Sequence, residues 1–226
     1  MTTPQTLALF DLDGTLIPRD SDHAFNEFVI ELGWADAAEF KRRNDGFYQD
    51  YLEGRLDIAA YVDFATSPWR GRTEQELAMA SERFVDTVVR PMLLPQAQAL
   101  VQRHLDAGDE VAVVTATNDF VTRPIARLFG VHTLIATELE RDDNGRVTGR
   151  IAGTPSFREG KVERVGAWLA QGGRGFASFA RSIFYSDSTN DLPLLERVSE
   201  PVATNPGPAL ERIALQRGWP VLKLFT

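Results

Sequence analysis

The chain opens with a short apolar run that ends in a group of polar residues. Residues 7–10 are all apolar, and they are followed directly by Asp11-Leu12-Asp13-Gly14-Thr15. An unbroken apolar run of this length is typical of a strand buried on both faces of a parallel sheet. We therefore predict a buried strand that places two aspartates at its carboxyl end, the edge where open α/β sheets bind ligands.

A long segment with helical periodicity follows this first strand. Between residues 18 and 91, apolar side chains such as Phe25 and Phe28 recur on one helix face, and no stretch has the alternation of a half-buried strand. Glycine and proline residues divide the segment into several helices. We predict that residues 18–91 form an all-helical cap domain, inserted into a catalytic core that comprises residues 1–17 and 92–226.

From residue 95 onward, strand and helix patterns alternate. Apolar runs predict strands at residues 110–115, 131–137, 182–186, 201–204 and 220–224, with helical patterns between them. The dipeptide Asn144-Gly145, inside the alternating segment 138–151, predicts a β-hairpin. This order predicts an α/β fold: a Rossmann-like, mostly parallel sheet with helices on both faces, plus the inserted helical cap and the hairpin.

Composition and charge exclude several classes of function. The chain has 226 residues, a formal net charge of −8 and no cysteine. The negative charge argues against nucleic acid or an anionic membrane as partner, and the lack of cysteine excludes thiolate nucleophiles and Cys-based zinc sites. The first residues do not resemble a signal peptide, and no apolar run approaches the ~20 residues of a membrane span. A cytoplasmic location is therefore predicted.

Polar residues also follow later strands in the predicted sheet. Thr115 ends one strand, Lys161 opens a helix after the hairpin, and another strand is followed by Asp187-Ser188-Thr189-Asn190-Asp191. A hydroxyl and an ammonium group could hold phosphate oxygens, and two carboxylates four residues apart suit Mg²⁺. Each part alone has a simpler explanation, such as a packed threonine, a surface lysine or a helix cap. Their joint occurrence at strand ends indicates phosphate chemistry.

Together these segments resemble the four motifs of the haloacid dehalogenase superfamily of phosphohydrolases. The resemblance spans nearly the whole chain. A helical insertion after the first motif and the Asp-x-x-Asn-Asp form of the last one narrow it to the phosphoserine-phosphatase-like branch, subfamily IB. The second aspartate of the first motif, Asp13, is absent from dehalogenases, and the P-loop of Walker nucleotide-hydrolysing enzymes is absent here. The resemblance implies a phosphatase.

The resemblance also implies a role for each motif residue. Asp11 would attack phosphorus and form an aspartyl-phosphate, and Asp13 would protonate the leaving oxygen and then deprotonate the hydrolytic water. The implied Mg²⁺ site comprises the carboxylate of Asp11, the backbone carbonyl of Asp13 and the carboxylate of Asp187, with Asp191 orienting a metal-bound water and Lys161. The implied phosphate contacts are made by Thr115, Lys161 and Asn190.

The substrate is less well defined by sequence. In phosphoserine phosphatases an acidic residue nine positions after the nucleophile contacts the substrate amine, and Asp20 has that spacing here, although it could equally cap the first helix of the insertion. No arginine for a substrate carboxylate has a convincing position; the candidates are Arg42, Arg43, Arg55 and Arg72. An amine contact without a carboxylate contact favours an amino-alcohol phosphate such as histidinol phosphate.

Three alternatives stay open on this evidence. The same residues could hydrolyse phosphoserine, or transfer the phosphoryl group to an alcohol acceptor, or serve a non-catalytic module that binds a phospho-ligand or a protein. A mere binder would not need both Asp11 and Asp13, which argues against the last reading. The histidines are not required for this chemistry: His23 could line the cap cavity, whereas His104 and His132 are expected on the surface or satisfied in the core. The expected partner is a small phosphomonoester, and the oligomeric state is not indicated.

Overall fold

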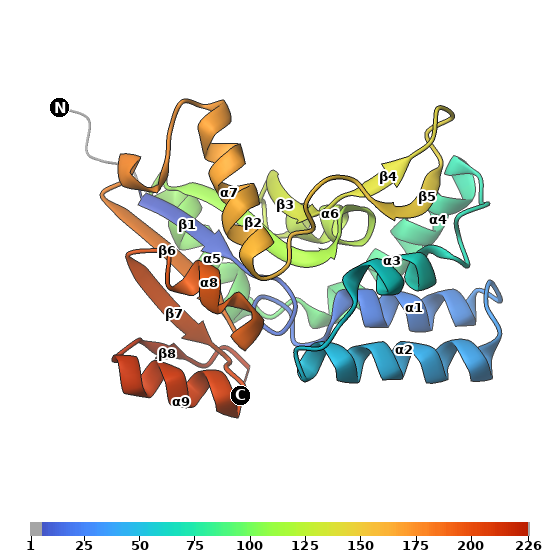
Figure 1. The fold of residues 1–226 in the computed structure, drawn as a ribbon, viewed down its shortest axis with the longest axis horizontal. Coiled ribbons are helices and arrows are strands. Elements are labelled where there is room, and N and C mark those ends of the chain that lie inside the picture. The colour runs from blue at the N-terminus through green and yellow to red at the C-terminus, as the bar shows by residue number, and fades with distance from the viewer. Residues whose placement is uncertain (1–5, 226) are drawn as a thin grey trace.

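A six-stranded parallel sheet forms the centre of the molecule. The computed structural model describes residues 6–225 (Figure 1). The strands have the order β3-β2-β1-β6-β7-β8, and every neighbouring pair is parallel. Their bounds are Thr6–Phe10 (β1), Glu110–Asn118 (β2), Thr133–Thr137 (β3), Arg181–Ser186 (β6), Glu200–Thr204 (β7) and Val221–Leu222 (β8). The predicted α/β fold class is confirmed.

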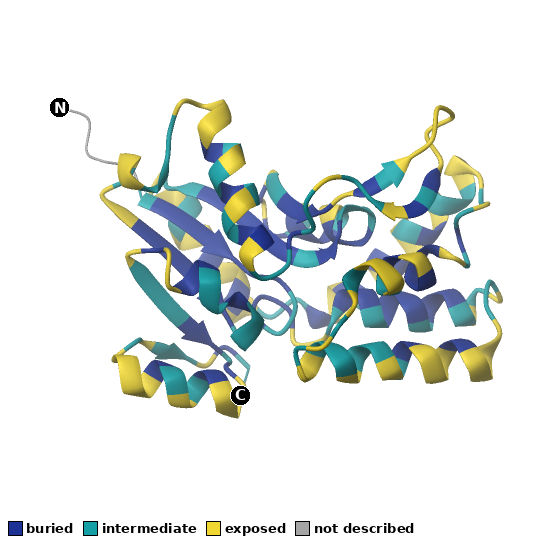
Figure 2. Ribbon diagram, in the orientation of Figure 1, coloured by how far each residue is buried: buried dark blue, intermediate teal, exposed yellow. Residues whose placement is uncertain are grey.

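Strand β1 is buried on both faces, as its apolar run predicts. Leu7, Ala8, Leu9 and Phe10 have no exposed surface (Figure 2). Ala8 and Phe10 belong to one apolar cluster, and Leu7 and Leu9 belong to a second one, because successive side chains of a strand point to opposite faces. The strand therefore carries Asp11 out of the middle of a rigid, three-layered core.

Helices cover both faces of the sheet. On one face lie α5 (Pro95–Asp106) and α6 (Asp119–Leu128), whose apolar residues join the cluster of Phe10. On the other face lie α7 (Glu159–Gln171), α8 (Leu192–Leu195) and α9 (Pro208–Arg217), which pack on Leu7 and Leu9. This arrangement leaves the carboxyl ends of the strands as the edge where polar loops gather.

The predicted helical segment is a group of four α-helices beside that edge (Figure 1). These are α1 (Ser21–Glu31), α2 (Ala37–Leu52), α3 (Ile58–Thr66) and α4 (Glu74–Phe84), followed by a π-helical turn at Val85–Val89 and a 3-10 turn at Arg90–Met92. Aspartate or threonine side chains cap all four α-helices at their N-termini. Phe25 packs against Phe84 and against Phe120 of α6, so the segment shares its apolar core with the sheet domain.

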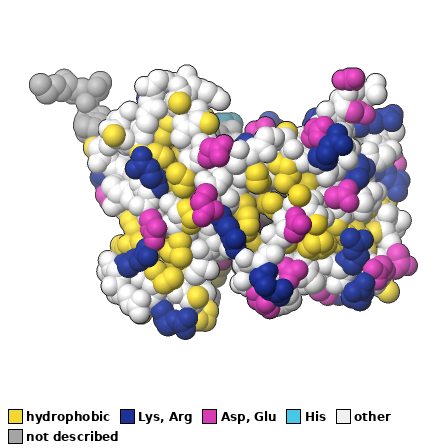
Figure 3. Space-filling view, viewed as in Figure 1, with side chains coloured by type: hydrophobic (Ala, Val, Ile, Leu, Met, Phe, Trp, Pro, Cys, Tyr) yellow, Lys and Arg dark blue, Asp and Glu magenta, His cyan; other side chains and the backbone are white. Residues whose placement is uncertain are grey.

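The hairpin forms at the predicted Asn-Gly turn. Strands β4 (Leu139–Arg141) and β5 (Val147–Ile151) are antiparallel, and Gly145 in the turn has a φ of 77°. Strand β5 contacts α3 of the helical segment. The view in Figure 3 shows acidic and basic side chains interspersed across both the sheet domain and the helical segment. No helix among residues 6–225 is long and apolar enough to cross a membrane.

Some predicted boundaries are wrong, for local reasons. Strand β2 continues to Asn118, beyond the predicted end at residue 115, and Asn118 pairs with Thr137 of β3. The last strand stops at Leu222, because the N–H groups of Leu224 and Phe225 donate to Oδ1 of Asn205 instead of to a strand.

Candidate active site

The loop after β1 brings Asp11 and Asp187 close together. Gly14 has a φ of 75°, and a Cβ on Gly14 would lie 2.3 Å from Oδ2 of Asp187. Glycine is therefore required both for the backbone conformation and for the close approach of the two loops. The side chain of Asn205 donates to the carbonyls of Gly14 and Thr15, at 3.1 Å each, and holds the turn in place.

Lys161 is buried between two carboxylates. It is 2% exposed, and its Nζ lies 2.9 Å from Oδ1 of Asp11 and 2.7 Å from Oδ1 of Asp191. Burial alone would lower the pKa of Lys161, but the two carboxylates outweigh that effect and raise it. Burial raises the pKa of Asp191 to about 6 against the opposing effect of Lys161, and it also raises the pKa of Asp11. Lys161 is therefore a fixed positive charge beside the expected nucleophile.

Asp11 and Asp187 share a third residue, Thr15. Its Oγ1 lies 3.1 Å from Oδ2 of Asp11 and 3.2 Å from Oδ1 of Asp187, and it accepts the N–H of Asp187 at 3.1 Å. One hydroxyl proton can serve only one of the two carboxylates at a time. Burial and the charges of Asp11 and Asp191 raise the pKa of Asp187 well above its usual value. The pair is thus an anionic site whose charge the protein compensates only in part.

The donor set at this point fits Mg²⁺. The carboxylates of Asp11 and Asp187, which share the hydroxyl of Thr15, are the candidate oxygen donors. Asp191 binds Lys161 and the hydroxyl of Ser186, at 2.7 Å. No group of three or more acidic or histidine side chains within residues 6–225 is arranged to hold a metal. Mg²⁺ is usually bound through one or two carboxylates and keeps several waters. The site therefore suits magnesium better than a metal that needs a full protein cage.

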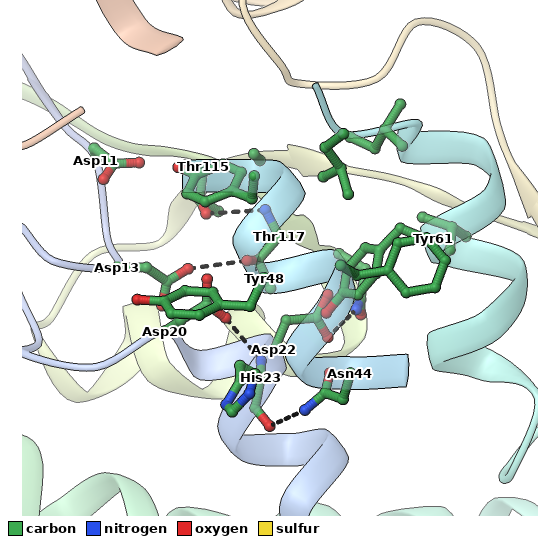
Figure 4. A pocket seen from close by; sticks show the side chains of 17 residues that line it. Asp11, Asp13, Asp20, Asp22, His23, Asn44, Tyr48, Tyr61, Thr115 and Thr117 are labelled. Carbon is green, nitrogen blue, oxygen red and sulfur yellow. Dashed lines mark hydrogen bonds between the residues drawn. The ribbon is translucent and has the colours of Figure 1, made fainter. Parts of the chain in front are cut away.

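Asp13 points away from this pair and toward the helical segment. Its Oδ1 accepts the backbone N–H of Ser21 at 2.7 Å, and its Oδ2 accepts the hydroxyl of Thr117 at 2.9 Å. Burial and the charge of Asp20 raise the pKa of Asp13 to about 7. A carboxyl group with this pKa can both give and take a proton near neutral pH. Figure 4 shows Asp13 and Thr117 at one side of a pocket.

The other predicted phosphate ligands lie in different surroundings. Thr115 is 1% exposed and lines the pocket, and its Oγ1 accepts the N–H of Thr117. Asn190 instead contacts the helical segment: its Nδ2 donates to the carbonyl of Tyr51 at 3.2 Å. Its Oδ1 lies 3.4 Å from Nε of Arg158, which also donates to the carbonyl of Gly54. The structure thus brings Thr115 to the pocket and Asn190 to the seam between sheet domain and helices.

The helical segment supplies the other wall of the pocket. Lining side chains include Asp20, Asp22, His23, Tyr48, Tyr51 and Tyr61, opposite Asp11, Asp13 and the 115–118 stretch (Figure 4). Asp20 both lines the pocket and caps α1, where it accepts the N–H of His23 at 2.7 Å. Asp20 can therefore cap α1 and still present its carboxylate to a substrate amine in the pocket.

Neither lysine nor arginine is among the described residues that line this pocket. Each of the four candidate arginines has a partner elsewhere. The nearest partners are Glu39 for Arg42, the ring of Phe64 for Arg43, Asp50 and Glu53 for Arg55, and Glu76 for Arg72. The pocket as described offers no cation to a carboxylate on the leaving group.

The histidines lie as expected. His23 lines the pocket and its Nε2 is 3.1 Å from Oδ1 of Asp45. His104 is satisfied by Asp109 at 2.7 Å and by the hydroxyl of Tyr185 at 2.9 Å, and His132 is exposed.

Sequence reasoning missed several residues of the site. Thr15, Thr117 and Ser186 bind carboxylates of predicted site residues, and Asn205 fixes the turn around Gly14. Thr15 and Thr117 lie within two residues of predicted site residues, so their position was the available signal. Nothing in the local sequence marks Asn205, because its partners come from loops far away in the chain.

A family model and a known relative both match most of the chain. The sequence model of the haloacid dehalogenase-like hydrolase family matches residues 8–196. The chain is 47% identical over 218 residues to a histidinol-phosphatase from Neisseria meningitidis serogroup C (strain 8013), which covers 96% of this chain and 98% of that protein.

Solved structures share the fold. The crystal structure of a protein with unknown function from Bordetella pertussis Tohama I has a TM-score of 0.93 and 53% identity, covering 99% of this chain and 100% of that one. A phosphoserine phosphatase, solved as an analogue of its phospho-aspartyl intermediate, has a TM-score of 0.67 at 16% identity, covering 99% and 95% of the two chains. The latter likeness concerns the fold alone.

Proposed function

Because the chain belongs to the haloacid dehalogenase-like hydrolase family and is a phosphatase, we propose that it hydrolyses a small cationic amino-alcohol phosphate, with Mg²⁺ as cofactor. The observation that carries the proposal is the pocket beside Asp11, which Asp20 and Asp22 line and where no lysine or arginine is among the described lining residues. Histidinol phosphate has the required chemistry, and the 47% identical relative is a histidinol-phosphatase. It is therefore our first candidate.

In the first step, a carboxylate oxygen of Asp11 forms a bond to phosphorus while the bond from phosphorus to the alcohol oxygen breaks. Asp13 gives its proton to the departing alcohol oxygen, a role that its pKa of about 7 supports. Lys161 lies 2.9 Å from Asp11 and offsets the negative charge of the phosphoryl group as it approaches. Thr115 offers a hydroxyl on the same side of the pocket as Asp11.

In the second step, a water attacks phosphorus and the bond to Asp11 breaks, which frees inorganic phosphate and restores the carboxylate. Asp13, now ionised, takes a proton from that water, so the two steps return it to its starting state. Thr117 and the N–H of Ser21 hold the Asp13 carboxylate in one orientation through both steps.

We propose that Mg²⁺ is held by the carboxylates of Asp11 and Asp187 and by the backbone carbonyl of Asp13. The ion supplies positive charge that lets an anionic carboxylate approach an anionic phosphate. Asp191 contributes indirectly, because it fixes Lys161 rather than pointing a free oxygen toward the ion. Asn190 is a weaker candidate for phosphate binding, since its amide contacts Tyr51.

Two related activities are less well supported. Phosphoserine carries a carboxylate that would face Asp20 and Asp22 without a lysine or arginine among the described lining residues. Transfer to an alcohol acceptor would use the same intermediate, and partitioning between water and an added alcohol would measure it. A non-catalytic binding role leaves the paired Asp11 and Asp13 unexplained.

We further propose that residues 18–91 act as a cap over the core of residues 1–17 and 92–226. Motion at the two crossings, near Pro18 and at residues 89–91, would admit substrate and release product. A π-helical turn at Val85–Val89 lies next to the second crossing, which supports a hinge there. The expectation of a cytoplasmic location stays a prediction.

The experiment that tests the proposed reaction is phosphate release from an aryl phosphate with and without Mg²⁺. We expect activity that requires Mg²⁺ and falls to background in Asp11→Asn, because an amide cannot form the phosphoryl bond. The matched control is Asp106→Asn, an exposed residue at the end of α5, which should retain full activity. Turnover that persists in Asp11→Asn would contradict the mechanism.

A further inference from the structure

One buried carboxylate in the pocket has no cationic partner. Asp22, in the first turn of α1, is 4% exposed, and no lysine, arginine or histidine in the described part of the chain forms an ion pair with it. Asp11 and Asp191, which are buried to a similar degree, share Lys161. Buried charges in proteins are normally paired, because an isolated one costs several kcal/mol. Without a cation, burial raises the pKa of Asp22 to about 8 and keeps the carboxyl group largely protonated near neutral pH, whereas a bound cation would favour the charged form.

Neutral donors fix the orientation of Asp22. Its Oδ1 accepts from Nδ2 of Asn118 at 3.0 Å, and Tyr61 also hydrogen-bonds its carboxylate. The amide of Asn118 cannot turn round, because its Oδ1 accepts the N–H of Val121 at the start of α6. A side chain held from both the sheet domain and α3 is placed for binding rather than free to rotate into solvent.

Asn26 supports the buried wall next to Asp22 from behind. Asn26 is fully buried, and its Nδ2 contacts two pocket-lining residues, Asn44 at 3.0 Å and Tyr61 at 3.3 Å. Its Oδ1 has no partner among the described residues. Asn26 is not among the described residues that line the pocket, so it holds Asn44 and Tyr61 in place from behind rather than meeting a ligand.

Asp22 lies on the same pocket as the reacting groups, but farther along it. In Figure 4, Asp13 and Asp20 lie between Asp11 and Asp22, and Tyr61 lies on the far side of the pocket from Asp11. A phosphate placed at Asp11 would therefore direct the far end of its leaving group toward Asp22. Tyr48 and Tyr61 line the path and offer aromatic surface to a ring.

We propose that Asp22 is a specificity-determining residue whose carboxylate binds the N–H group of a cationic nitrogen heterocycle at the far end of the leaving alcohol. This inference rests on the proposed phosphatase function and refines its substrate class. Asp20, nearer to Asp13, then faces the ammonium group of the same alcohol. Two carboxylates on one wall thus correspond to two positive charges on one substrate.

The electrostatics of the pocket support this assignment. Burial, together with the charges of Asp20 and Asp13, raises the pKa of Asp22 to about 8. A cation bound at Asp22 would offset all three effects and form a charge-assisted hydrogen bond. Such bonds contribute more than neutral ones, which makes the position suited to selection between leaving groups.

The test compares Asp22→Asn with the parent protein on three substrates. These are histidinol phosphate, phosphoethanolamine, which has the ammonium group but no ring, and an aryl phosphate. We expect KM for histidinol phosphate to rise roughly 10- to 100-fold with kcat nearly unchanged, and both other substrates to change by less than about threefold. Equal losses on all three substrates, or an unchanged KM for histidinol phosphate, would overturn the proposal.

The matched control is Asp57→Asn, which keeps a good N-cap on α3 and should alter none of these constants. A second measurement needs no variant and so survives a folding failure. In the parent protein, the product alcohol histidinol should inhibit aryl phosphate hydrolysis at least about tenfold better than phenylalaninol, which carries a neutral ring. Equal inhibition by both alcohols would also overturn the proposal.

Different results would contradict the proposed phosphatase function and the proposed role of Asp22. If the proposed phosphatase function were wrong, the parent protein would release no phosphate from the aryl phosphate. If only the inference were wrong, hydrolysis would proceed normally and the ring would make no difference to KM or to inhibition.

Discussion

The two walls of the pocket treat buried carboxylates in different ways. Behind the wall formed by the sheet domain, Lys161 holds both Asp11, which lines the pocket, and Asp191, which does not. On the wall formed by the helices, Asp20 and Asp22 have raised pKa values because of burial, and no lysine or arginine is among the described lining residues. The first wall is suited to the step common to all phosphomonoesters. The second is suited to a positively charged leaving group.

The largest expected effect comes from removing the cation behind the first wall. Lys161→Met should lower kcat roughly 10²- to 10³-fold on every substrate alike, because the phosphoryl group loses its fixed positive charge and Asp11 loses its partner. The control is Lys223→Met, an exposed lysine paired with Glu211, which should have no effect on kcat. Steady-state kinetics on an aryl phosphate and on histidinol phosphate give the two values of kcat. A loss of kcat confined to histidinol phosphate would contradict the assignment of Lys161 to the step that all substrates share.

A smaller effect is expected from a methyl group at the turn that joins Asp11 to Asp187. In Gly14→Ala the added Cβ would lie 2.3 Å from Asp187, whereas Gly33→Ala, at a similar φ of 70°, has nothing within 4 Å. Gly33→Ala should cost about 1 kcal/mol of unfolding free energy from backbone strain. Gly14→Ala should cost about 1–3 kcal/mol more and weaken Mg²⁺ binding. Equal destabilisation in chemical denaturation would show that the close approach is unimportant.

The uncompensated charge of the second wall predicts a pH effect on stability. Asp22 has a pKa of about 8 in the folded protein and ~3.9 when unfolded, so the folded state binds more protons between these values. Stability without ligand should therefore fall as pH rises from about 4 to about 8.

Asp22→Asn removes this contribution and should be more stable than the parent protein at pH 8, by about 5 kcal/mol for this difference in pKa. Near pH 4 the two should unfold alike, since the carboxyl group is then protonated in both states for much of the population. Denaturation curves at the two pH values measure the difference. A variant that is less stable at pH 8 would indicate that the Asp22 carboxylate has a stabilising partner.

The smallest effect is expected at the seam between the walls. Arg158 and Asn190 hold the carbonyls of Gly54 and Tyr51, and Arg158 does so from a backbone φ of 52°. Arg158→Ala should raise KM about three- to tenfold on all substrates, because it loosens the loop between α2 and α3 and removes no residue that lines the pocket. Hydrogen exchange at residues 51–55 should speed up, and Arg42→Ala, an exposed control on α2 whose partner is Glu39, should leave both KM and exchange unchanged. A rise in KM for one substrate alone would instead indicate that Arg158 contacts the leaving group of that substrate.

Sequence predicted the first wall far better than the second, and the reason is physical. Parallel strands end at one edge of a sheet, so Asp11, Thr115 and Asp187 were expected to meet as soon as their strands were recognised. Lys161 was expected to reach them from the next helix, and in the structure it does. The family resemblance strengthened these expectations.

The second wall depends on how helices pack, which local patterns do not encode. Asp22 belongs to none of the predicted motifs, and its contact with Asn118 joins residues 96 positions apart. Asn190 was expected at the phosphate, but the docking of α2 brings the carbonyl of Tyr51 to its amide. The helix expected after the hairpin begins at Glu159, and Arg158 just before it has a φ of 52° and donates to the carbonyl of Gly54 in the loop between α2 and α3.

The most direct test of the central claim is the ratio of kcat/KM for histidinol phosphate to that for phosphoserine in the unmodified protein with Mg²⁺. The two substrates share the phosphate ester and the ammonium group, but one adds a cationic heterocycle and the other a carboxylate. Like charges facing each other in a buried site cost several kcal/mol, so we predict a preference of at least roughly 100-fold for histidinol phosphate. A ratio near one, or a preference for phosphoserine, would contradict the assignment of the acidic wall to a cationic leaving group.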